Sequence, residues 1–329
     1  MKKILAHLFE YKTFSKEEAY SILTNIATGK YDPYQIAAFM TTYGMRSIRV
    51  EELAGFRQAM YDLCLQVEFP GYDLIDLCGT GGDGKNTFNI STLASFVVAG
   101  AGYQVAKHGN VGVSSGCGSS NVMEYLGYTF TNKKDELQRQ LDEANICFLH
   151  APLFHPAMKT VAPIRRALGV KTFFNMLGPL TNPANPRFQA VGVFSLELAR
   201  LYNYLYQGTN KQYSVIHALD GYDEISLTGD FKIINNQGEQ YVKVEDLGFT
   251  PIATSDLAGG ETVEEAAAIF SAIIKGKGNS VQNNVVLSNA AFAIKTIHPE
   301  KTFGDCYYEA EQSLLGKKAL QSFQKLVSA

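Results

Sequence analysis

Apolar residues recur at helical spacing through the first 66 residues of the chain and gather into short runs after Gly71. Ser15-Lys16-Glu17-Glu18 is a capping-box pattern, and it predicts a helix that ends near Gly29. Asp32-Pro33 opens the next helix, and another is expected from about Val50 to Leu65. The pattern therefore predicts a small helical domain over residues 1–70.

The rest of the chain alternates short apolar runs with glycine loops and helices, which is typical of a mainly parallel sheet with right-handed crossovers. Strands are expected at 74–78, 104–106, 146–149, 190–194 and 213–219, and a hairpin around residues 235–238. Helices are expected near 262–275, 283–295 and 306–327. We therefore expect an α/β domain over 71–329, while part of 155–185 returns to helical spacing and is expected to join the helical domain.

Composition narrows the class of protein. The 329 residues are 46% hydrophobic and 19% charged, which suits a chain that buries a sizeable core. A net charge of −3 gives no chain-wide attraction for nucleic acid or for an anionic membrane. Five widely spaced cysteines without a CxxC pair argue against a disulfide framework or a zinc site, and no stretch predicts a signal peptide or a membrane span. Cytoplasmic residence is the expectation.

The first glycine loop, GTGGDGK at 79–85, follows an apolar strand and precedes a helix expected to start at Ser91 or Thr92. Glycines let the backbone approach an anion, and the free N–H groups of a helix start attract phosphate. The loop fits GxGxxG, but no carboxylate follows about 20 residues later to bind a ribose of NAD. It also nearly fits a nucleotide P-loop, with Asn86 in place of the magnesium-binding hydroxyl, so a nucleoside triphosphatase stays open on this motif alone.

Three further segments offer ligands for one substrate that carries phosphates and for another that carries a carboxylate. Lys107 and the small residues up to Asn121 form a second loop with a positive charge and hydroxyls for a second phosphate. The adjacent acids Asp223 and Glu224 follow an apolar strand, where hard oxygen ligands suit magnesium on a diphosphate. Arg165, in a helix, is a candidate for binding an aromatic carboxylate.

Taken in order, these motifs closely resemble the anthranilate phosphoribosyltransferase family over nearly the whole chain. The motifs are GTGGDG, NIST at 89–92, KHGN at 107–110, HPAMK at 155–159, VAPIRR at 161–166, the segment 175–183 and DGYDEIS at 220–226. The resemblance implies a small helical domain with a larger α/β domain, as in nucleoside phosphorylases and phosphoribosyltransferases, and a homodimer. It also implies transfer of phosphoribosyl from phosphoribosyl diphosphate to anthranilate, in tryptophan biosynthesis.

The resemblance also implies the site residues. Substrate-binding positions are Gly79, Gly82, Asp83, Thr87, Asn89, Ile90, Ser91, Thr92, Lys107, His108, Gly109, Asn110, Ser115, Ser119 and Arg165, of which Asn110 and Arg165 match contacts to anthranilate. Ser91, Asp223 and Glu224 match magnesium positions, for two ions in all. No catalytic base is assigned, because an aniline nitrogen is already neutral at pH 7.

Four positions depart from the family pattern: Val111, Gly116, Asn121 and Phe154. Two positive charges are thereby absent from the second loop, which puts the affinity for the donor in question. Two rival functions are a pyrimidine nucleoside phosphorylase, which needs no magnesium pair, and a non-catalytic nucleic-acid-binding relative, which the net charge disfavours.

Overall fold

The structure is a computed structural model that describes residues 1–111 and 118–328. Contacts between residues divide it into two compact units, and each unit takes two pieces of the chain: residues 1–67 with 151–185, and residues 68–150 with 186–329. Among the described residues, no helix is both long and apolar enough to cross a membrane.

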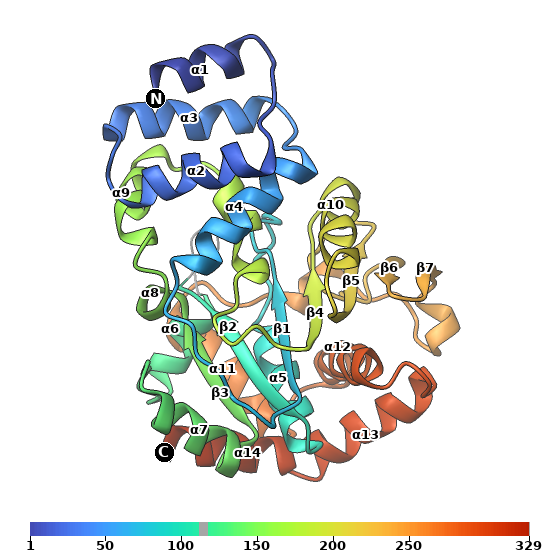
Figure 1. Cartoon of the computed structure of the whole chain (residues 1–329). Helices are drawn as coiled ribbons and strands as arrows, with labels where there is room; N and C mark the ends of the chain where they lie inside the picture. Colours follow the sequence, from blue (N-terminus) through green and yellow to red (C-terminus); the bar gives the residue numbers. More distant parts are fainter. Residues whose placement is uncertain (112–117, 329) are drawn as a thin grey trace. The chain divides into compact units, whose positions relative to one another are not determined.

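The first unit is helical. It contains α1 (Lys2–Phe9), α2 (Lys16–Ala27), α3 (Pro33–Met45), α4 (Val50–Asp62), α8 (Ala151–Phe154), α9 (Met158–Leu168) and the short 3-10 helices η1 (Phe173–Met176) and η2 (Gly178–Leu180) (Figure 1). The expected start signals act locally: Ser15 and Glu18 form a capping box on α2, and the Asp32 side chain accepts a hydrogen bond from Tyr34 N at the start of α3.

Aromatic side chains from both chain pieces form the core of the helical unit. The ring of Phe173 lies 5.9 Å from that of Phe39, 5.1 Å from that of Tyr43 and 4.7 Å from that of Phe56. Phe39, Phe56 and Phe173 are almost fully buried. Aromatic pairs at these separations stabilise a core beyond the area that they bury. The later piece of the chain therefore completes the core begun by α3 and α4.

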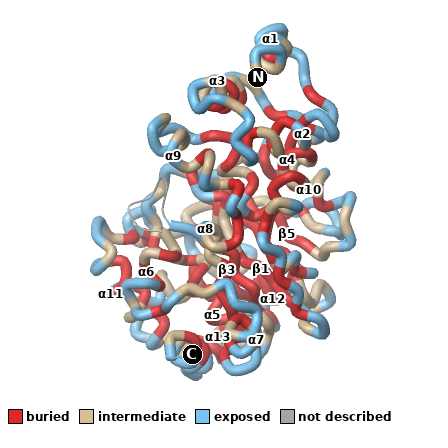
Figure 2. The backbone as a smooth tube through the Cα atoms, turned by 60° about the vertical axis from the view of Figure 1, so that its left-hand side comes forward, coloured by how far each residue is buried: buried red, intermediate tan, exposed pale blue. Residues whose placement is uncertain are grey.

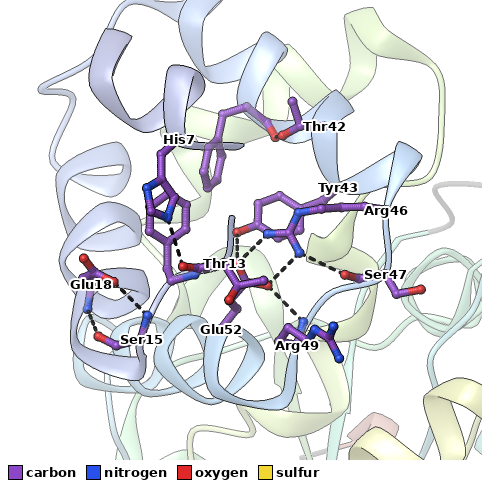
Figure 3. Close-up of polar contacts among 12 residues, drawn as sticks. His7, Thr13, Ser15, Glu18, Thr42, Tyr43, Arg46, Ser47, Arg49 and Glu52 are labelled. Atoms are coloured by element: carbon purple, nitrogen blue, oxygen red, sulfur yellow. Dashed lines mark hydrogen bonds and ion pairs between the residues drawn. The ribbon is translucent and has the colours of Figure 1, made fainter. Parts of the chain in front are cut away.

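Beside this core lies one carboxylate, that of Glu52, with several donors around it (Figure 3). Its two oxygens accept hydrogen bonds from Phe14 N and Tyr43 Oη at 3.1 Å, from Arg49 N at 3.0 Å, and from the Arg46 guanidinium at 3.0 and 2.5 Å. A fully buried charge is stable only when paired and hydrogen-bonded, and Glu52 meets both conditions. It joins the α1–α2 connection, the end of α3 and the start of α4.

The second unit is built on a seven-stranded sheet. Its strands are β1 (Leu74–Gly79), β2 (Gln104–Gly109), β3 (Ile146–His150), β4 (Phe188–Gly192), β5 (Gln212–Ala218), β6 (Phe231–Asn235) and β7 (Gly238–Val242), in the order β3-β2-β1-β4-β5-β6-β7. The first five strands of that order are parallel, and the hairpin β6–β7 adds two antiparallel strands. The mainly parallel sheet expected from the sequence is confirmed.

The helices of this unit are α5 (Ile90–Gly100), α6 (Ser119–Tyr125), α7 (Lys134–Ala144), α10 (Leu196–Gln207), α11 (Val263–Ile274), α12 (Ser280–Ile297), α13 (Phe303–Leu315) and α14 (Lys318–Ser328), with the 3-10 helices η3 (Glu245–Leu247) and η4 (Thr254–Leu257). Chain order runs from β1 through α5 to β2 in one direction and from β4 through α10 to β5 in the other. Right-handed crossovers therefore place α5 and α10 on opposite faces, and β1 and β4 flank the point where the order reverses. Figure 2 shows β1, β3 and α5 in the most buried part of the unit.

Several expected boundaries were wrong, and the strand predicted at 104–106, for example, continues to Gly109. The single helix predicted at 306–327 is two helices, because Gly316 ends α13 and Lys317 has a φ of 62°, a left-handed conformation that an α-helix cannot continue through. The strand predicted at 190–194 spans 188–192, where Phe188 and Gly192 pair with both β1 and β5. The apolar residues continue past Gly192, the last residue that pairs in the sheet. An apolar pattern therefore does not show where the strand ends.

Candidate active site

The site begins where β1 and β4 end, at two glycines that pair with each other across the sheet, Gly79 and Gly192. A Cβ atom on Gly192 would lie 1.5 Å from the carbonyl oxygen of Asp223, and one on Gly79 would lie 2.4 Å from Asp223 Oδ2. Only glycine therefore lets the segment after β5 pack directly on the ends of these strands. This is the edge at which open α/β sheets carry their ligands.

The first glycine loop continues from β1 in a conformation that requires glycine. Gly81, Gly82 and Gly84 have φ values of 64°, 76° and 77°, a region that other residues rarely adopt. The backbone N–H of Gly81 donates a hydrogen bond to Asp223 Oδ2 at 2.6 Å. Asp83 Oδ1 accepts one from Lys85 N at 3.0 Å. The loop and the acidic segment are thus in direct contact.

A segment near η4 supports the far side of the loop, and no motif in the sequence predicts it. Phe88 N donates to Leu257 O at 2.9 Å, Gly259 N donates to Asn86 O at 2.8 Å, and Thr87 forms a β-bridge with Ala258. The expected donor-binding residue Thr87 is therefore held by backbone pairing to a part of the chain that carries no recognisable signal.

The start of α5 presents backbone donors to the same place. Asn89 is the N-cap residue, Ile90 is the first helical residue and is buried, and Ser91 N donates to Glu224 Oε1 at 3.2 Å. The helix begins one residue earlier than the expected Ser91. Thr92 is buried, and its hydroxyl has no hydrogen-bond partner within the described part of the chain. Free donors at a helix start attract anions.

Lys107, on β2, brings a buried positive charge. Its ammonium group donates to Leu77 O at 2.6 Å and to Ser91 Oγ at 3.4 Å, and the side chain is only 2% exposed. Burial lowers the pKa of Lys107, whereas the nearby carboxylate of Asp76 and that of Glu224 raise it. Asp76 is fully buried in β1 and also accepts a hydrogen bond from His108 N at 3.1 Å. The predicted cation therefore lies between β1 and the start of α5, near enough to Glu224 to feel its charge.

Burial and the neighbouring negative charges raise the pKa of both acids of the pair, Asp223 and Glu224. Burial, and next the neighbouring Asp83, raise the pKa of Asp223 to about 7. Burial, and then the charges of Asp223 and Asp83, raise the pKa of Glu224 well above its usual value. Like charges this close resist ionisation unless a cation offsets them. A cation bound beside the pair would therefore favour the ionised form of both carboxyls.

The donor set fits a magnesium ion shared with a substrate. Glu224 Oε2 is buried without a hydrogen-bond partner among the described residues, and Asp223 Oδ2 lies beside the glycine loop. No group of three or more His, Cys, Asp or Glu side chains that would hold a metal by itself occurs in residues 1–111 and 118–328. Magnesium binds through one or two carboxylates and completes its shell with water and substrate phosphates, so this pair suffices.

The second loop is described at its two ends. Gly109 ends β2, Asn110 O accepts hydrogen bonds from Ser120 N at 3.2 Å and Ser119 Oγ at 3.3 Å, and Ser119 begins α6. The expected Ser115 and the departure at Gly116 lie outside the described residues. Among the other departures, Val111 is exposed and Asn121 Oδ1 accepts a hydrogen bond from Gly118 N at 3.1 Å.

Arg165 belongs to the helical unit and lies in the last turn of α9. Its guanidinium donates to Asn175 Oδ1 at 3.2 Å and lies 5.8 Å from the ring centre of Phe174. Burial lowers the pKa of Arg165. The departure at Phe154 is a buried apolar side chain of the same unit. Arg165 is thus a partly enclosed cation beside an aromatic ring, which suits an aromatic carboxylate.

Three supporting residues were not predicted: Asp76, Gly192 and Asn289, whose side chain pairs with the backbone of Ile225 next to Glu224. A charged residue inside the apolar run 74–78 was a usable signal for Asp76, because a buried acid needs partners. A glycine at the end of an expected strand was a weaker signal for Gly192. Asn289 lies in the middle of α12, where the sequence marks nothing.

Comparison with known proteins agrees with this arrangement. Two models of the glycosyl transferase family match, the helical bundle domain over residues 2–64 and the a/b domain over residues 71–319. The two-part fold and these two matches thus define a glycosyl transferase. More narrowly, the chain belongs to the anthranilate phosphoribosyltransferase family.

The relatives that establish this membership align with the chain along almost their whole length. The anthranilate phosphoribosyltransferase of Christiangramia forsetii is 56% identical, over 99% of this chain and 98% of its own. The crystal structure of the Thermus thermophilus enzyme is 31% identical, with a TM-score of 0.91, and covers 98% of each chain. The Saccharomyces cerevisiae enzyme in complex with PRPP and Mg is 25% identical, with a TM-score of 0.88, over 95% of this chain and 93% of its own. Another yeast structure is a complex with 4-fluoroanthranilate.

Proposed function

We propose that this chain transfers the phosphoribosyl group of phosphoribosyl diphosphate to the amino nitrogen of anthranilate, with release of diphosphate, in tryptophan biosynthesis. The observation that carries the proposal is the direct contact of the acidic pair with the glycine loop, through the hydrogen bond from Gly81 N to Asp223 Oδ2. This contact supports a metal ion held between these carboxylates and a phosphate on the loop. The complex of the yeast relative with PRPP and Mg supports it.

The donor would lie along the glycine loop and the start of α5. Backbone donors of Gly79 and Gly82, with the N–H group of Thr92 at the start of α5 and the Ser91 hydroxyl, would bind phosphate oxygens. Lys107 would contribute its charge from β2, and the ends of the second loop, at Asn110 and Ser119, would contact the other phosphate. The two ends of the first glycine loop are already held by β4 and by the 257–260 segment, which limits the rearrangement that binding there requires.

Asp223, Glu224 and Ser91 would hold magnesium, for which we propose two ions. Magnesium supplies charge neutralisation of the diphosphate, which makes it a better leaving group. The protein's own part is electrostatic and positional: the buried acids hold the diphosphate end, and the loops keep C1 of the ribose oriented as positive charge develops there.

Arg165 would bind the carboxylate of anthranilate, with Asn175 orienting its guanidinium. The yeast relative's complex with 4-fluoroanthranilate supports an acceptor of this kind. As the C1–N bond forms, the diphosphate leaves with the electron pair of its bond to C1, and the amine gives up one proton to water or to the departing diphosphate. The amine is neutral at pH 7, so its attack needs no prior deprotonation by the protein.

A second copy of the chain is the proposed partner of α3. Tyr34 and Met45 are 85% and 90% exposed, and together with Thr41 they form one stripe along the helix. Two large apolar side chains on one helix face favour an interface. Met45→Asp should shift the sedimentation coefficient from that of a dimer to that of a monomer, and an unchanged coefficient would count against this face.

We also place the enzyme in the cytoplasm, where free thiols such as the buried Cys147 and Cys306 stay reduced.

The test of the activity is the loss of anthranilate fluorescence in the presence of phosphoribosyl diphosphate and magnesium. Fluorescence should fall only with all components present, and should stop falling in the double variant Asp223→Asn, Glu224→Gln. A wild-type protein that is folded but leaves fluorescence unchanged would contradict the proposal. Cleavage of a pyrimidine nucleoside by phosphate without metal would then be the assay to run.

A further inference from the structure

Asn289, on α12, pairs its side-chain amide with the peptide backbone of Ile225, the residue directly after Glu224. Its Oδ1 accepts a hydrogen bond from Ile225 N at 3.1 Å, and its Nδ2 donates to Ile225 O at 2.9 Å. Nδ2 also donates to Val285 O at 2.9 Å, one turn back in the same helix. Only one orientation of the amide sets its NH₂ group against the two carbonyl oxygens and its oxygen against Ile225 N. The side chain is therefore fixed against both the helix and the acidic segment.

The acidic segment is thereby fixed from two sides. On one side the carbonyl oxygen of Asp223 packs on Gly192, with no room for a Cβ atom. On the other, Ile225 is fully buried and its backbone is paired with Asn289. Asn289 also lines a cavity of about 30 Å³ together with Asp223 and Glu224. Its contact is thus with the backbone that carries the two acids and with the space beside their side chains.

We propose that Asn289 is a positioning residue for the magnesium site, an inference that rests on the proposed function. It acts through Ile225: if this peptide moves, Glu224 Oε1 moves away from Ser91 N and its buried Oε2 moves with it. Outer partners of metal ligands commonly change metal affinity by about 10- to 100-fold, because they fix the direction of the ligand. Asn289 is such an outer partner of Glu224, because it holds the peptide group that follows Glu224 in the chain.

The experiment compares three variants of the full chain. Asn289→Ala removes all three hydrogen bonds, whereas Asn289→Asp keeps the size but sets a carboxylate oxygen against the carbonyl oxygens of Ile225 and Val285. The matched control is Asn284→Ala on the same helix, which removes the hydrogen bond that Tyr307 Oη donates to Asn284 Oδ1 at 3.0 Å. If the Ala variant unfolds, the Asp variant still tests the proposal, because it keeps the packing.

Binding of Mn²⁺ in the presence of diphosphate, measured by electron paramagnetic resonance, is the readout that does not depend on turnover. The dissociation constant should rise about tenfold or more in both Asn289 variants and stay within about twofold in Asn284→Ala. Half-saturating magnesium in the transferase assay should rise in parallel, while KM for anthranilate stays within about twofold. A lower melting temperature with unchanged Mn²⁺ affinity would overturn the proposal and leave Asn289 a purely structural role. A wild type that binds no Mn²⁺ would instead overturn the metal site itself.

Discussion

Asn175 accepts two hydrogen bonds through one oxygen, from the Arg165 guanidinium at 3.2 Å and from Thr172 N at 3.1 Å. The short helix η1 thereby sets the direction of the arginine fork. This partner is a neutral amide, so the contact leaves the positive charge of Arg165 without a countercharge, as the proposed binding of a substrate carboxylate requires. A carboxylate at position 175 would compete with the acceptor for the same guanidinium.

Asn175→Asp should therefore raise KM for anthranilate by about tenfold or more, since a charge-assisted contact is worth about 1.5 to 3 kcal/mol. KM for phosphoribosyl diphosphate should change much less. Steady-state kinetics with each substrate varied in turn will show the difference. Asn25→Asp, at an α2 residue whose Oδ1 accepts from Lys30 Nζ at 2.9 Å, is the matched control and should change neither constant. Equal changes in both constants would contradict a specific role at the acceptor.

The raised pKa of Asp223, about 7, predicts how pH acts on the metal-free protein. A carboxyl whose pKa is higher in the folded than in the unfolded chain contributes stability below the unfolded value, and that contribution is lost as pH rises through the folded value. Magnesium needs the ionised form, so it should bind more weakly as pH falls from about 8 to about 6.

Thermal melting with and without magnesium checks this prediction. The increase in melting temperature on adding magnesium should be larger at about pH 8 than at about pH 6. Asp223→Asn should reduce the increase at both pH values and remove most of the difference between them. An increase that is the same at both pH values in the wild type would show that this carboxyl does not control the site.

Gly192→Ala should impair both folding and activity. The added Cβ would meet a backbone oxygen, that of Asp223, at 1.5 Å, and backbone cannot move aside as a side chain can. We expect a loss of unfolding free energy of at least about 2 kcal/mol and a strong loss of kcat. Gly208→Ala is the matched control: its Cβ would lie 3.7 Å from Leu205 O, an ordinary contact. Denaturant unfolding and the fluorescence assay measure the two effects, and equal behaviour of the two variants would refute the argument.

Glu52→Gln should destabilise the helical unit. It removes the charge that pairs with Arg46 and that accepts donors from three elements. Loss of one partner from a buried ion pair costs about 3 to 5 kcal/mol, so the unfolding midpoint in urea should fall clearly. Glu51→Gln, next to it but exposed, should leave the midpoint within the error of the measurement. A midpoint that is equal in the two variants would show that the charge of Glu52 contributes nothing.

Local signals in the sequence predicted most of the fold, because caps, glycine loops and apolar runs act over a few residues. Ser15 and Asp32 start the helices as expected, and the glycine loop at 79–85 follows a strand as expected. The helix break at Lys317 was not predicted, because a left-handed backbone conformation does not change the pattern of apolar residues. The contact of Asn289 with Ile225 was not predicted for another reason: the two residues are 64 positions apart and meet only in the folded chain.

The division of the helical unit between two chain pieces has a consequence for biosynthesis. Residues 1–67 leave the ribosome first, but Phe173, which packs on Phe39 and Phe56, follows only after β1, β2 and β3 have been made. Until then the inner faces of α3 and α4 lack part of their apolar cover, and exposed apolar surface on a nascent chain favours aggregation. A chain that stops after residue 67 would remain in that exposed state, because the helical unit completes its core only when residues 151–185 join residues 1–67.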